Sequence, residues 1–147
     1  PVLFDSSHEF SFGKGNIVRE GTDVSLVACG IMVSKALEAA ELLKKENISA
    51  RVINLPSIKP LDETIILKAA SETQGIVSCE DHSITGGLGS AIAETLSENN
   101  SGRLARIGVR NIFGESGDPK ELYKKFSMDV NSIYNSAKKL LQNRSGE

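Results

Sequence analysis

The sequence predicts a three-layer α/β/α fold, similar to a Rossmann fold, around a five-stranded, mostly parallel sheet with one antiparallel edge strand. Short apolar segments alternate with amphipathic segments of ten or more residues along the 147-residue chain, and parallel strands need crossover helices of that length. Residues 24–29 are apolar almost throughout, which is typical of a strand covered on both faces. No repeat or linker divides the chain. We therefore expect one domain over residues 1–147, with residues 1–16 as an irregular lead-in that contains His8.

Composition excludes several classes of function. The net charge is −2, so no basic surface for nucleic acid is expected, and no apolar run is long enough to cross a membrane. The two cysteines, Cys29 and Cys79, each end an apolar strand, so we expect buried, reduced thiols and a cytoplasmic protein. Two scattered histidines and no Cys-x-x-Cys pair predict no metal site.

The first two strands are expected at residues 16–19 and 24–29, joined by a turn over residues 20–23. The short connection favours an antiparallel hairpin between them. Periodicity and turn residues predict helices at residues 33–46, 62–73, 88–99 and 119–126, and a last helix that begins at residue 127 or 129. Three further strands are predicted at residues 50–55, 76–79 and 105–109. Asp62 and Asp118 are the expected N-caps, with Pro119 at the first helical position.

A polar corner over residues 80–85 follows the strand at 76–79 and leads into a glycine-rich helix start. Loops after parallel strands gather at one edge of the sheet, where such folds place their sites. The candidate residues for a substrate channel or an interface at that edge are Lys59, Glu80, Asp81, His82, Gly86, Gly87, Gly89 and Arg110.

The glycines do not make a nucleotide site. Gly87-Leu88-Gly89 lacks the third glycine of the dinucleotide fingerprint and follows a late strand. An anion at the helix N-terminus would meet Glu80 and Asp81, and no Lys or Arg lies between Glu80 and Gly102. The glycines then serve a tight turn and close helix packing. His82 could act as an acid or base or bond across a subunit interface, and a small-anion regulatory module using Lys59, His82 and Arg110 stays open.

Four segments in order resemble the C-terminal domain of transketolase-type thiamine-diphosphate enzymes. They are residues 19–30, residues 50–62, Glu80-Asp81-His82 with residues 86–91, and residues 113–117. The resemblance covers nearly the whole chain but only the last third of such an enzyme. It implies the fold derived above.

For the full enzyme, the resemblance implies two-carbon ketol transfer between sugar phosphates, as in the pentose phosphate pathway, with thiamine diphosphate and a divalent metal. Pro119 stands where the cofactor motif Gly-Asp-Gly would have its second glycine after Gly117-Asp118. We therefore expect no cofactor bound by this chain alone, and no catalytic residue can be carried over. The implied partners are the cofactor-binding domains or subunit of the same enzyme, in a homodimer, with this chain packing the dimer and the channel wall.

Close relatives leave alternatives. The equivalent domain of 1-deoxyxylulose-5-phosphate synthase and that of the β subunit of a 2-oxoacid dehydrogenase share the fold, and a role in dimerisation alone is also possible. The corner at Glu80-Asp81-His82 and the loop over residues 113–117 are more similar to transketolase.

Overall fold

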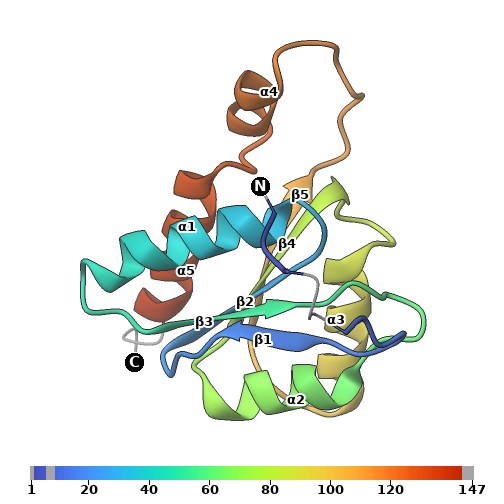
Figure 1. The fold of residues 1–147 in the computed structure, drawn as a ribbon, viewed down its shortest axis with the longest axis vertical. Coiled ribbons are helices and arrows are strands. Elements are labelled where there is room, and N and C mark those ends of the chain that lie inside the picture. Colours follow the sequence, from blue (N-terminus) through green and yellow to red (C-terminus); the bar gives the residue numbers. More distant parts are fainter. Residues whose placement is uncertain (1, 6–8, 144–147) are drawn as a thin grey trace.

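The structure is a computed structural model that describes residues 2–5 and 9–143, so His8 lies outside the described residues. Five strands form one sheet in the spatial order β1-β3-β2-β4-β5 (Figure 1). They are β1 (Asn16–Arg19), β2 (Val24–Ala28), β3 (Ala50–Asn54), β4 (Ile76–Ser83) and β5 (Leu104–Val109). Every pair is parallel except β1 with β3. The predicted α/β fold with one antiparallel edge strand is confirmed.

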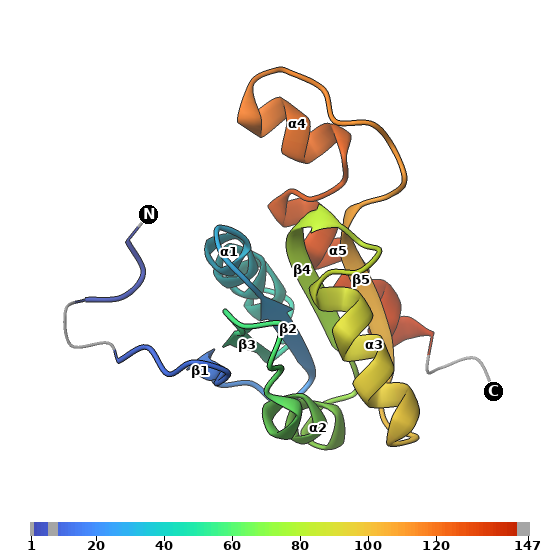
Figure 2. The same ribbon diagram turned by 90° about the vertical axis from the view of Figure 1, so that its right-hand side faces the viewer.

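Helices cover both faces of the sheet (Figure 2). One face carries α1 (Met32–Lys44) and α5 (Val130–Gln142), and the other carries α2 (Glu63–Glu72) and α3 (Leu88–Glu98). Leu26 packs into the first core and Val27 into the second, so β2 is buried on both faces, as its apolar run predicts. The short helix α4 (Pro119–Lys125) projects beyond the end of the sheet (Figure 1).

The expected hairpin between the first two strands is wrong. β1 pairs with β3, with Asn16 opposite Asn54, while β2 lies between β3 and β4. Thr22 N and Asp23 N both donate to Ser49 O, at 3.1 and 2.8 Å. The turn between β1 and β2 therefore lies against the residue that precedes β3. A strand that is apolar on both faces belongs in the middle of a sheet, which forces the polar β1 to the edge.

Strand β4 is longer than expected, because the corner predicted at residues 80–85 is largely strand. Ser83 pairs with Val109 of β5 after a register shift that follows Cys79. Pairing with β5 therefore extends β4 beyond its apolar segment. This tertiary pairing outweighs the polar composition of Glu80, Asp81 and His82.

Three of the helices begin with an N-cap residue whose own side chain accepts from the first turn. Asp62 accepts from Ile65 N at 3.4 Å, and Asp118 accepts from Lys120 N at 2.9 Å, with Pro119 in the first turn. Both expected N-caps are confirmed. Asp129, rather than Ser127, caps α5 by accepting from Ser132 N at 3.0 Å. Across the described residues, no helix is both long and apolar enough to cross a membrane.

Candidate functional site

Glu80 lies at the centre of the candidate corner, but it turns inward. Its residue is 1% exposed, and its carboxylate accepts from Leu88 N at 2.7 Å and from Gly89 N at 2.9 Å. These are two of the N–H groups that a helix leaves free at its N-terminus. The chain therefore supplies its own anion to α3, where the helix dipole favours negative charge. Glu80 therefore does not project from the sheet edge.

The close approach of the Glu80 carboxylate requires a glycine at position 87. A Cβ at this position would lie 1.9 Å from Glu80 Oε2. Gly89 is similarly confined, since its Cβ would lie 2.8 Å from both Ser78 Oγ and Arg106 Cδ. Gly86 differs, because its φ of +78° needs glycine while the space around it is open. The glycines thus allow a tight turn and close helix packing, the structural role expected from the sequence.

His82 is the exposed member of the corner. Its side chain is 63% exposed, and its Nδ1 lies 2.7 Å from Ser83 O and 3.9 Å from Glu80 Oε2. The backbone contact fixes the ring at the surface, beside a buried carboxylate. The arrangement can donate or accept a proton only at the outer face of the corner, toward solvent or a partner.

Asp81 connects the corner to α4. Its Oδ2 accepts from Tyr123 OH at 2.6 Å, and Lys35 Nζ lies 4.1 Å from the centre of the Tyr123 ring. Partial burial, the hydrogen bond to Asp81 and the charge of Asp81 together raise the pKa of Tyr123 to about 12. Sequence reasoning missed Tyr123, because no local pattern pairs residues 42 positions apart.

The Tyr123 hydroxyl should titrate late. In a Tyr134→Phe variant, where Tyr123 is the only tyrosine, we expect the ultraviolet absorbance of tyrosinate to rise with a midpoint near pH 12. Because the folded pKa lies above the ordinary value, the contact stabilises α4 fully below about pH 10 and is lost as pH rises toward 12. Adding Asp81→Asn should lower the midpoint. An unshifted midpoint near 10 in the folded protein would show that the Asp81 contact does not form.

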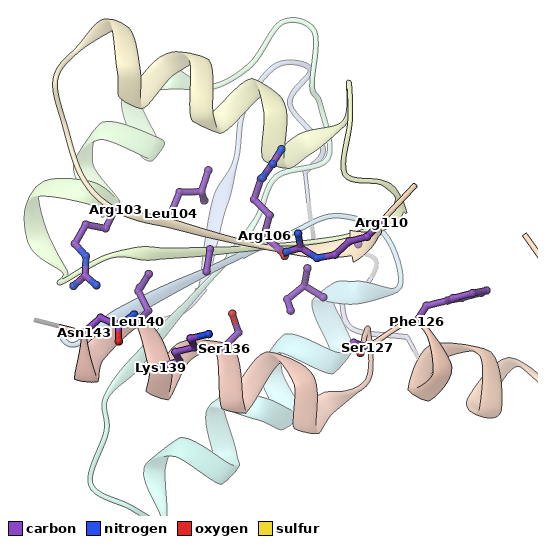
Figure 3. A pocket seen from close by; sticks show the side chains of 13 residues that line it. Arg103, Leu104, Arg106, Arg110, Phe126, Ser127, Ser136, Lys139, Leu140 and Asn143 are labelled. Atoms are coloured by element: carbon purple, nitrogen blue, oxygen red, sulfur yellow. The ribbon is translucent and has the colours of Figure 1, made fainter. Parts of the chain in front are cut away.

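Lys59 and Arg110 do not meet. Lys59 lines a hollow of about 440 Å³ that lies beside Gly86 and Gly87 and runs along α3 as far as Glu98. Arg110 lines a separate hollow of about 500 Å³ between β5 and α5, shown in Figure 3. Strands β2 and β4 lie between β3 and β5 in the sheet. The structure therefore does not gather Lys59, His82 and Arg110 into one anion pocket.

The two cysteines are free thiols. Cys79 is buried and Cys29 is half-buried. Burial raises the pKa of both thiols, with smaller contributions from nearby acidic groups. Neither thiol is therefore disposed to act as a nucleophile at neutral pH.

The described residues do not fit thiamine diphosphate and its metal. Among them, no group of three or more His, Cys, Asp or Glu side chains is arranged to hold a metal ion. Asp118, the acid of the chain's Gly-Asp pair, is engaged in capping α4.

Comparison with known proteins decides the family. The family model described as transketolase, C-terminal domain, matches residues 13–133. The chain belongs to this family. It is 43% identical over 144 residues to the 6-deoxy-6-sulfo-D-fructose transketolase subunit of Clostridium sp. (strain MSTE9), covering 97% of this chain and 45% of that protein.

The chain is also similar to a solved structure and to a synthase. A solved structure described as a split gene transketolase, inactive beta4 tetramer, matches with a TM-score of 0.93 and 41% identity, covering 97% of this chain and 46% of that one. The 1-deoxy-D-xylulose-5-phosphate synthase of Caldanaerobacter subterraneus is 42% identical over 133 residues, covering 88% of this chain and 21% of that protein. The chain thus spans less than half the length of these relatives.

Proposed function

We propose that this chain is the C-terminal domain or subunit of a transketolase that moves a two-carbon ketol unit from a ketose phosphate to an aldose phosphate. One carbon–carbon bond of the donor breaks and one to the acceptor's carbonyl carbon forms, so no oxidant is needed. The observation that supports this most is the similarity, over 97% of the chain, to a transketolase subunit and to a split gene transketolase.

The chain contributes structure to that reaction. The remaining domains or subunit of the enzyme, in a cytoplasmic homodimer, hold thiamine diphosphate and its divalent metal. This chain presents the exposed side of its polar edge to them, with Lys59, Asp81 and His82 at the margin of the substrate channel. The inward-turned Glu80 supports this division, because it neutralises the α3 N-terminus internally and leaves no free anion site there.

A second candidate is the equivalent domain of 1-deoxy-D-xylulose-5-phosphate synthase, which the 42% identity favours. Product analysis on the complete enzyme distinguishes the two. We expect two-carbon transfer between sugar phosphates and no 1-deoxy-D-xylulose 5-phosphate. Formation of that product without ketol transfer would replace the transketolase assignment with the synthase.

The loop before α4 should contribute to assembly with the rest of the enzyme. Phe113 is 97% exposed and Ile112 is 52% exposed, in the segment between β5 and α4. That segment and α4 project beyond the end of the sheet (Figure 1). Burying one aromatic side chain stabilises by roughly 1.5–3 kcal/mol. We therefore expect Phe113→Ala to weaken association with the cofactor-binding part by about tenfold or more, as measured by sedimentation.

Phe113→Leu, which keeps most of the apolar surface, should restore most of that affinity. The melting temperature of the isolated chain should be the same for both variants, since Phe113 is almost fully exposed. Unchanged association of the Phe113→Ala variant would remove this loop from the interface.

A further inference from the structure

The outer edge of β5 forms a positively charged groove, called here the β5 groove. Its volume is about 500 Å³, and its lining includes Arg103, Arg106, Arg110 and Lys139 but no aspartate or glutamate. In Figure 3, Arg106 comes from β5, Arg103 and Arg110 come from the residues just before and just after it, and Lys139 comes from α5. The whole chain has a net charge of −2, so this concentration of cations is local.

β5 is an edge strand, so some of its backbone N–H and C=O groups point away from β4 and toward the groove. Ile76 N donates to Arg103 O and Ile84 N donates to Val109 O, so the odd-numbered residues of β5 bond to β4. Alternation along a strand then turns the N–H and C=O groups of Leu104 and Arg106 away from β4. Such a row of backbone groups is a template for an added strand.

The arginines are differently engaged. Arg106 Nη1 donates to Ile84 O at 3.1 Å, on the side of α3. Arg110 folds back along the edge, and its Nη2 donates to Arg106 O at 2.9 Å in an exposed contact. Arg103 Nη1 is buried, and no described residue accepts a hydrogen bond from it. Arg103 therefore keeps a donor that no described residue satisfies, and Lys139 is exposed. Arg110 becomes available to an anion when another donor replaces its contact with Arg106 O.

Length distinguishes the possible occupants. Arg103 and Arg110 are seven residues apart, which is about 23 Å along an extended strand. A single phosphate cannot bridge that separation, whereas an extended peptide of about seven residues spans it. The outward-facing residues of β5 are even-numbered, so a second copy pairing antiparallel about Arg106 would set the two Arg106 residues opposite each other, and like charges in that position are destabilising.

We propose that the β5 groove binds an extended, acidic peptide segment of another protein chain, which adds to the sheet as a sixth strand beside β5. Backbone hydrogen bonds to Leu104 and Arg106 supply the register, and carboxylates pair with Arg103, Arg110 and Lys139. This binding is separate from ketol transfer and does not depend on it.

The test uses the 147-residue chain and a fluorescent peptide of about seven residues in which glutamate alternates with valine. Fluorescence anisotropy should show saturable binding, and hydrogen exchange should slow at the amides of Leu104 and Arg106. N-methylation of alternate peptide nitrogens should weaken binding by about tenfold. Arg103→Gln and Lys139→Gln should each weaken it several-fold, while Lys68→Gln, at an exposed position of α2, should leave it unchanged.

Lys139 is exposed, so its variant tests the groove even where Arg103→Gln impairs folding. Three results would overturn the proposal. The first is no saturable binding, which would leave the arginines as a guard against edge-to-edge aggregation. The second is equal binding of the N-methylated peptide or of a helical Glu/Ala peptide. The third is full displacement by millimolar inorganic phosphate, which would indicate a small-anion site.

Discussion

Replacing Glu80 with alanine is expected to lower the free energy of unfolding by about 3–5 kcal/mol. Each hydrogen bond to a charged acceptor is worth about 1.5–3 kcal/mol, and Glu80 accepts two from the start of α3. The loss leaves Leu88 N and Gly89 N buried without an acceptor. Because domains of this size are stable by about 5–15 kcal/mol, urea denaturation should show a large shift of the midpoint.

Two further variants separate the cap from the charge. Glu80→Gln keeps the shape, but its amide group can accept from only one of the two N–H groups, so an intermediate loss is expected. Glu94→Ala, at an exposed position of the same helix, should change stability by less than about 0.5 kcal/mol. Equal losses for Glu80→Ala and Glu94→Ala would mean that Glu80 does not cap α3.

Gly87→Ala is expected to cost nearly as much as removing the carboxylate itself. Its Cβ would lie 1.9 Å from Glu80 Oε2, so the carboxylate must leave the helix N-terminus. The backbone at Gly87 has φ −101°, so alanine brings no penalty from a positive φ there. We expect a loss of about 2–4 kcal/mol in urea denaturation.

Gly86→Ala is the matched control, because Gly86 has a positive φ but open space around it. Strain alone should cost about 1–2 kcal/mol there. In the Glu80→Ala background, Gly87→Ala should cost little more, since no carboxylate remains to be displaced. Additive losses of stability in this double-mutant cycle would mean that the effect of Gly87→Ala does not come from displacing the Glu80 carboxylate.

The features that local sequence determines were predictable. Apolar periodicity located the helices, and Asp62 and Asp118 were identified as caps from residue type and position. The double-sided burial of β2 followed from its apolar run. These signals depend on neighbours within a turn or two of chain.

The features that depend on residues far apart in the sequence were not predictable. The polar composition of residues 80–83 hid a strand that is completed only by pairing with β5. The inward turn of Glu80 depends on Gly87, directly before α3, which gives its carboxylate room beside the helix start. Glu80 followed by Gly87 and Gly89 is a signal that could have suggested it. The separation of Lys59 from Arg110 depends on strand order, which the mistaken hairpin left unresolved.

Reconstitution is the measurement that tests the proposed function most directly. Two-carbon transfer from a ketose phosphate to an aldose phosphate would be assayed with this chain alone, with the cofactor-binding polypeptide alone and with both, in the presence of thiamine diphosphate and Mg²⁺. We expect no transfer by this chain, and activity that appears and saturates as the chain is added to its partner. Full activity of the cofactor-binding polypeptide without this chain, or transfer by this chain alone, would contradict the proposed role.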